Sequence, residues 1–150
     1  MKKNFVLGTS QLNIETDYGI SQTNIKISID IIFKILESAW NFGIRHFDTA
    51  PSYNNEKIIG EFINKKKILS DIKILTKIPS LKNENNVNKA CFESINNSLK
   101  NCNIEKIHTI FFHDEKDFYL IKKEKNFFSK LSKQFKIENF GFSVYERKIA

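Results

Sequence analysis

The 150-residue sequence has no apolar run that approaches the roughly 20 residues needed for a membrane-spanning helix. The N-terminal segment Met1-Lys2-Lys3 is basic, but no long apolar stretch and no small-residue cleavage site follow it, so we expect no signal peptide. Only two cysteines occur, Cys91 and Cys102, and they form no CxxC pair and have no histidine nearby at metal-ligand spacing. These absences predict no membrane anchor and no metal site, and favour two reduced thiols on a helix of a cytoplasmic protein.

The composition is that of a globular protein, with 41% hydrophobic and 27% charged residues. A chain of this length suits one domain over residues 1–150, and such a domain buries about 70% of its surface. The net charge of +7 raises nucleic acid as an alternative partner. The lysines are spread along the chain, however, with short runs at residues 2–3, 65–67 and 122–123. We therefore predict no nucleic-acid partner.

Short apolar segments alternate with longer segments that have helical periodicity. The predicted strands cover residues 5–7, 44–49, 72–77, 107–113 and 137–143, and the predicted helices cover residues 32–40, 58–63, 87–99 and about 117–134. Ser28 is the expected N-cap of the first helix, and Gly43 follows its end. A polar, turn-rich stretch spans residues 9–26. Such alternation predicts an α/β fold with about five parallel strands and crossover helices.

Two architectures fit this alternation. One strand–helix unit takes roughly 33 residues, so eight units need about 265, close to the size of a (β/α)₈ barrel. A doubly wound sheet of five strands is the rival, but its signature is a Gly-rich turn after the first strand. Only Gly8 stands there. We therefore predict a partial (β/α)₈ barrel of the TIM type.

Reactive side chains follow the predicted second, third and fourth strands. Asp48 ends one strand and Tyr53 lies in the loop after it, while Lys77 and His113 end the next two strands. The carboxyl ends of parallel barrel strands converge on one face, where active sites lie. Each residue also has a structural interpretation: a helix cap for Asp48, packing for Tyr53, solvation for Lys77 and a turn for His113. The occurrence of all four residues at matching strand ends is poorly explained by chance.

These four side chains suit the reduction of a carbonyl group, which takes a hydride on carbon and a proton on oxygen. A phenol with a pKa near 10 is a poor proton donor at neutral pH. A neighbouring ammonium favours the phenolate, which adapts the phenol to proton transfer. A carboxylate holds the ammonium in place, and a histidine orients the substrate oxygen. An unrelated small-molecule binding domain with the same residues is a rival interpretation.

The residues resemble the aldo-keto reductase family. The most specific segment is 43–53, GIRHFDTAPSY, which continues in family style through 55–62, NEKIIGEF. Further matching segments are LTK at 75–77, FHD at 112–114, LGTSQL at 7–12, DYGI at 17–20 and GFS at 141–143. The resemblance covers nearly the whole chain. One departure is Val144, where the family often has asparagine.

The resemblance implies an NADPH-dependent reductase of aldehydes or ketones. By that similarity Tyr53 is the general acid, Lys77 tunes it, Asp48 pairs with Lys77, and His113 orients the substrate. The implied cofactor contacts are Gly8 and Thr9 directly after the first predicted strand, Asp48, and Ser143, whose counterpart in the family contacts the nicotinamide carboxamide.

The family also holds its cofactor with later strands and loops, which would follow residue 150. We therefore expect a C-terminally incomplete domain. The alternative function is a catalytically silent fragment, or an interaction or remnant domain, that self-associates or pairs with its missing C-terminal half.

Overall fold

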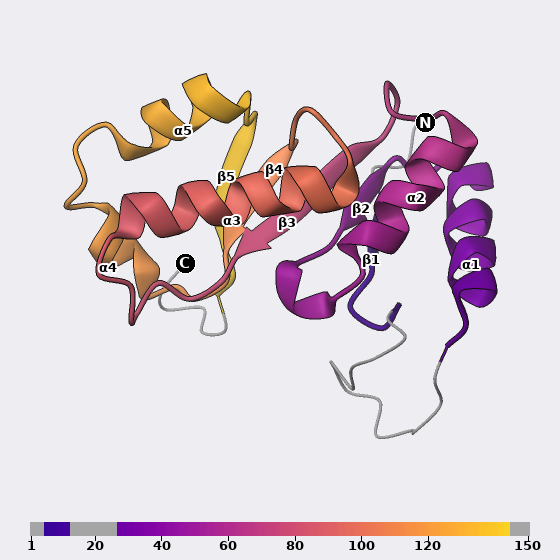
Figure 1. Cartoon of the computed structure of the whole chain (residues 1–150), viewed down its shortest axis with the longest axis horizontal. Coiled ribbons are helices and arrows are strands. Elements are labelled where there is room, and N and C mark those ends of the chain that lie inside the picture. The colour runs from indigo at the N-terminus through magenta and orange to yellow at the C-terminus, as the bar shows by residue number, and fades with distance from the viewer. Residues whose placement is uncertain (1–4, 13–26, 145–150) are drawn as a thin grey trace.

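A computed structural model describes residues 5–12 and 27–144 of the chain, which form an α/β fold (Figure 1). The resemblance noted at residues 17–20 and the basic first residues lie outside the described part. One parallel sheet holds five strands in the order β1-β2-β3-β4-β5. The strands are β1 (Val6–Gly8), β2 (His46–Asp48), β3 (Lys73–Ile78), β4 (Thr109–Phe112) and β5 (Asn139–Phe142). Each predicted strand is confirmed within a few residues of its expected ends.

The helices alternate with the strands along the chain. They are α1 (Ile29–Asn41), the 3₁₀ helix η1 (Pro51–Tyr53), α2 (Glu56–Lys66), α3 (Val87–Cys102), α4 (Asp117–Ile121) and α5 (Phe127–Phe135). The hydroxyl of Ser28 accepts a hydrogen bond from the Ile31 N–H, which confirms the predicted N-cap of α1. Gly43 has φ +95° directly after the helix, a conformation that glycine adopts without a steric penalty.

The strand order distinguishes the two architectures that the sequence left open. Every strand pairs with the next strand in the chain, from β1 to β5, and the order does not reverse among the described strands. A doubly wound sheet reverses its order at the point where the ligand binds. Successive pairing in one direction is the arrangement of a (β/α) barrel. The doubly wound interpretation is therefore wrong.

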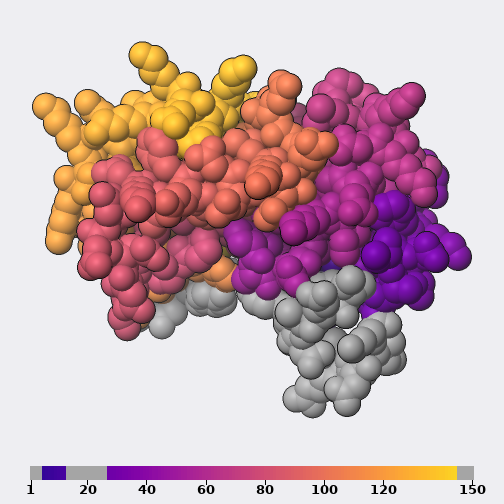
Figure 2. Space-filling model, in the orientation of Figure 1, coloured from indigo at the N-terminus to yellow at the C-terminus, as the bar shows by residue number. Residues whose placement is uncertain are grey.

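The two faces of the sheet differ in the side chains that they carry. Phe47, Ile110 and Phe112 are fully buried in the core that the sheet forms with the helices. Figures 1 and 2 show α2 and α3 lying over the strands on the side nearer the viewer. Because side chains alternate along a strand, Asp48 and Lys77 project from the opposite face. We call this second face the site face.

The prediction of one helix over residues 117–134 is wrong, because α4 and α5 are separate helices. The residues between them, 122–126, are Lys-Lys-Glu-Lys-Asn, none of which offers the core an apolar side chain. Asn126 adopts a left-handed conformation with φ 58°, which interrupts helical geometry. The helix therefore ends at Ile121 and a new one begins at Phe127.

Within the described ranges, no helix is both long enough and apolar enough to span a bilayer.

Candidate active site

The predicted site residues lie along one edge of the sheet, where the parallel strands have their C-terminal ends. Asp48 is the last residue of β2, and Lys77 is the next-to-last residue of β3. His113 and Ser143 follow β4 and β5 directly. Asp48 is in register with Leu75, so Lys77 lies two residues further along its strand. This offset brings the long lysine side chain back across the Asp48 carboxylate.

Lys77 joins the carboxylate to the phenol ring. Its Nζ lies 2.6 Å from Asp48 Oδ1 and donates a second hydrogen bond of 3.1 Å to the Thr49 carbonyl. The same Nζ lies 4.8 Å from the centroid of the Tyr53 ring, within the range of a cation–π contact. The Lys77 side chain is 10% exposed, whereas that of Asp48 is 27% exposed. The ammonium is thus enclosed, and the pair meets solvent on the side of the carboxylate.

Tyr53 is held close to Lys77 by the short helix η1. Pro51 at its first position fixes the backbone angle, and the Tyr53 N–H donates to the Ala50 carbonyl at 3.0 Å. Asn54 then adopts a left-handed conformation with φ 52° and turns the chain towards α2. Tyr53 is 7% exposed as a result. The structure therefore brings Asp48, Lys77 and Tyr53 together as the strand-end pattern indicated.

Asn55 stabilises this loop, and the sequence analysis did not single it out. Its Nδ2 donates to the carbonyl oxygens of Thr9 and Leu12, at 2.6 and 3.0 Å, and its Oδ1 accepts from the Thr49 hydroxyl at 2.7 Å. The side chain is fully buried. One amide thus connects the segment after β1 to the loop that carries Tyr53. A polar residue next to a turn gave no sign of burial in the sequence.

Thr9 fixes Asp48 from the other side. Both its N–H and its hydroxyl donate to the Asp48 carbonyl oxygen, each at 2.9 Å. Thr9 is fully buried, and its hydroxyl positions Asp48 through the backbone carbonyl of that residue. Gly8 is in register with Asp48 and is exposed, and a Cβ placed on it would meet nothing within 4 Å. The surface beside Asp48 is therefore open at Gly8.

His113 and Ser143 occupy the ends of the next two strands. The His113 N–H donates to the Ile78 carbonyl at 3.0 Å, and the Ser143 N–H donates to the Phe112 carbonyl at 2.8 Å. Both residues are half-buried. The backbone of β3 and β4 thus positions both of them, and each side chain belongs to the same edge of the sheet as Lys77.

A buried polar network lies beneath these residues. The carboxylate of Glu56, which is 3% exposed, accepts from the Thr76 hydroxyl at 2.9 Å and from Asn101 Nδ2 at 3.1 Å. These bonds connect the start of α2 to β3 and to the end of α3. Thr76, the residue next to Lys77, is therefore bonded to α2 and, through Glu56, connected to α3.

The two cysteines lie apart from this edge, on α3, and both are free and buried. Burial, with smaller contributions from Asp117 and Glu84, raises the pKa of the Cys91 thiol to about 12. Burial and the nearby Glu56 also raise the pKa of Cys102. Both thiols therefore stay protonated and unreactive at neutral pH. Among the described residues, no group of three or more His, Cys, Asp or Glu side chains could hold a metal ion.

Comparison at the level of protein families matches residues 4–149 to the aldo/keto reductase family. The chain belongs to this family. Among curated proteins, no sequence matches it. Its fold resembles that of many solved aldo-keto reductases, which confirms the α/β fold and the partial barrel predicted from the strand–helix alternation.

Three solved structures illustrate the likeness. The holo form of an aldo-keto reductase from Bacillus halodurans has a TM-score of 0.71 at 19% identity, with 93% of this chain and 45% of that chain covered. An aldo/keto reductase from Brucella melitensis has a TM-score of 0.67 at 24% identity, with 96% and 50% covered. An aldo-keto reductase from Klebsiella pneumoniae in complex with NADPH has a TM-score of 0.64 at 19% identity, with 77% and 40% covered. The chain thus spans about half the length of the reductases that it matches.

Proposed function

We propose that this member of the aldo/keto reductase family serves an NADPH-dependent reduction of an aldehyde or ketone to an alcohol, with Tyr53 as the general acid. The observation that carries the proposal is the position of Lys77. Its ammonium contacts both the Asp48 carboxylate, at 2.6 Å, and the face of the Tyr53 ring, at 4.8 Å from its centroid. A phenol, an ammonium and a carboxylate in contact form a chain of groups that can release and recover a proton.

Each residue has a separate task in this proposal. Tyr53 gives its proton to the carbonyl oxygen as the alcohol forms. Lys77 stabilises the negative charge that remains on the phenol oxygen, and Asp48 holds the ammonium in place. His113, at the end of β4, donates a hydrogen bond to the substrate oxygen and orients it. The buried Glu56–Thr76 contact keeps β3 in position.

NADPH would supply the hydride, and the residues at this edge suit a nicotinamide cofactor. Gly8 leaves open space beside Asp48, so a flat ring can approach the backbone there. Asp48 and Ser143 complete the contacts that we assign to the cofactor, and Ser143 is half-exposed beyond β5. Thr9 is fully buried, so it contributes through its hydrogen bonds to the Asp48 carbonyl. The complex of the Klebsiella pneumoniae reductase with NADPH supports the choice of this cofactor.

The test is the variant Tyr53→Phe, made in a form of the protein that is long enough to catalyse carbonyl reduction. We expect the rate of carbonyl-dependent NADPH consumption to fall by about 10²-fold or more, the usual contribution of general acid catalysis. NADPH affinity should stay nearly constant because only the hydroxyl is lost. Tyr119→Phe is the matched control, since Tyr119 is 56% exposed on α4. A Tyr53→Phe variant with near-normal turnover contradicts the assignment.

A second proposal is that the 150-residue chain is silent alone and acts as one part of an assembly. Two observations favour it: the chain spans about half of the reductases that it matches, and β1 and β5 are the outer strands of the described sheet. Edge strands carry unpaired N–H and carbonyl groups that can pair with another chain. The partner would be a second copy or a C-terminal half that supplies further strand–helix units.

With its two buried, protonated thiols, the protein suits the cytoplasm.

Sizing the 150-residue chain and titrating it with NADPH in a thermal-shift assay tests this second proposal. A cofactor at 100 times its dissociation constant stabilises a protein by about 2.7 kcal/mol. We expect a self-associated chain, or one that shows little or no shift. A saturable shift from a monomer would show that the chain is a working cofactor-binding unit.

A further inference from the structure

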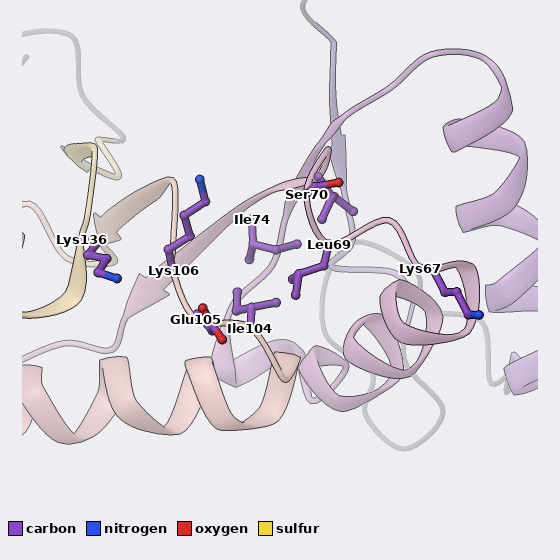
Figure 3. Close-up of a pocket in the computed structure, with 9 residues that line it drawn as sticks. Lys67, Leu69, Ser70, Ile74, Ile104, Glu105, Lys106 and Lys136 are labelled. Carbon is purple, nitrogen blue, oxygen red and sulfur yellow. The ribbon is translucent and has the colours of Figure 1, made fainter.

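A hollow of about 530 Å³ lies at the end of the sheet where its strands begin (Figure 3). Its walls come from the segments that lead into three strands: residues 67–74 before and within β3, residues 104–106 before β4, and Lys136 before β5. Lys77 lies near the C-terminal end of β3, whereas the hollow meets the same strand at its N-terminal end. The hollow is therefore separate from the candidate active site.

The body of the hollow is apolar. Ile72, Ile74 and Ile104 are each less than 10% exposed, while Leu69 is 42% exposed and leaves a large apolar surface in contact with solvent. Figure 3 shows Leu69, Ile74 and Ile104 pointing towards one another. A volume of about 530 Å³ falls within the range of about 300–1,000 Å³ that is typical of small-molecule sites. The hollow is thus large enough for a small organic ligand.

The charges around this hollow are mostly of one sign. Lys67, Lys106 and Lys136 line it, against the single carboxylate of Glu105. Figure 3 places Lys106 and Lys136 on one side and Lys67 on the other. Lys67 and Lys136 are the C-caps of α2 and α5, where cations offset the negative end of a helix dipole. That role explains two of the lysines, but it requires neither Lys106 nor an apolar hollow with an exposed leucine.

We propose that the hollow binds a small amphipathic anion, an apolar chain or ring that carries one carboxylate. The apolar body of this ligand packs against Leu69, Ile74 and Ile104. Its carboxylate lies on the side of Lys106 and Lys136, whose flexible side chains can turn to donate charge-assisted hydrogen bonds to it. Glu105 disfavours ligands with several negative charges. The proposal is independent of the reductase activity.

The test compares three probes of equal chain length by isothermal titration calorimetry: octanoate, octan-1-ol and octylammonium. We expect octanoate to bind saturably with one site per chain, octan-1-ol to bind at least tenfold more weakly, and octylammonium to give no measurable binding. The double variant Lys106→Gln and Lys136→Gln should weaken octanoate binding about tenfold or more, because hydrogen bonds to charged groups are lost. The matched control, Lys89→Gln, changes an exposed lysine of α3 outside the hollow and should bind octanoate as the unaltered chain does.

A second variant tests the apolar body of the site. Leu69→Ser keeps every charge and removes an exposed side chain, so it should weaken octanoate binding while leaving the fold intact. Equal binding of octanoate and octan-1-ol, or an equal loss in the Lys89→Gln control, would overturn the proposal. So would unchanged octanoate binding in the double lysine variant.

Discussion

Replacing Asn55 with aspartate tests how the loop that carries Tyr53 is held. The change keeps the size of the side chain but converts its donor nitrogen into an oxygen. That nitrogen now donates to the carbonyl oxygens of Thr9 and Leu12, at 2.6 and 3.0 Å, in a fully buried position. In the variant, the Leu12 carbonyl loses the Asn55 donor, the Thr9 carbonyl keeps only its bond from the Leu12 N–H at 2.8 Å, and both carbonyls face a third oxygen. We therefore expect a large loss of stability from an almost isosteric change.

The magnitude follows from the two lost hydrogen bonds. Leaving the Leu12 carbonyl without its partner costs about 1–3 kcal/mol and losing the second bond, to Thr9, costs about 0.5–1.5 kcal/mol, which together make about 1.5–4.5 kcal/mol. With a urea m-value of about 2 kcal/mol/M, the unfolding midpoint should fall by about 0.7–2 M. Circular dichroism during urea titration measures that midpoint. The control is Asn96→Asp, the same change at an exposed position of α3, which should alter stability by about 0.5 kcal/mol or less. A midpoint for Asn55→Asp that matches this control would refute the reasoning.

Three further outcomes follow from the geometry. Gly60→Ala is normally a stabilising change within a helix, but here it should destabilise the fold by about 1–3 kcal/mol. The reason is that a Cβ would lie 2.6 Å from the backbone carbonyl of Cys102. Thermal unfolding measures this loss of stability. Burial lowers the pKa of His46, with further contributions from Lys73 and the neighbouring His108. Below pH ~6.5 the unfolded state therefore binds more protons than the folded state, so stability should fall as the pH drops through that range. His46→Gln should flatten this dependence of stability on pH. In the proposed mechanism Lys77 supports Tyr53 through the ammonium that lies 4.8 Å from the centroid of its ring, so Lys77→Met should lower carbonyl-dependent turnover by about 10²-fold or more; near-normal turnover would show that Lys77 has no role in proton transfer.

Much of the fold could be predicted because strands and helices here follow local patterns. The N-cap at Ser28 and the left-handed Gly43 are local signals, and both are confirmed. The break between α4 and α5 escaped prediction for a physical reason. Ile121 and Phe128 are seven residues apart, about two helical turns, so the apolar period continues across the break. Periodicity therefore indicated one helix where the charged residues between them form a connection.

The residues of the candidate site also divide into those that the sequence predicts and those that it does not. Asp48, Lys77 and Tyr53 could be placed together from the sequence because parallel strands end at one edge of a sheet. Asn55 and Glu56 could not be recognised, since both look like ordinary surface residues at the start of a helix. Their burial depends on contacts with residues about 20 to 46 positions away, such as Thr76 and Thr9. Only the packed structure shows that these polar groups support the site.

In the proposed function, proton transfer and cofactor binding rest on partly different strands. The contacts that join Asp48, Lys77 and Tyr53 need only β2, β3 and the loop between them, and Thr9 and Asn55 fix that loop to the end of β1. The three groups that we propose for proton transfer are therefore assembled by the first three strands. In our proposal the described residues that contact the cofactor are Gly8, Asp48 and Ser143, at or directly after the ends of β1, β2 and β5. It follows that a Lys77-dependent environment of Tyr53 should persist in the 150-residue chain even where NADPH affinity is weak, so the two properties can be measured apart.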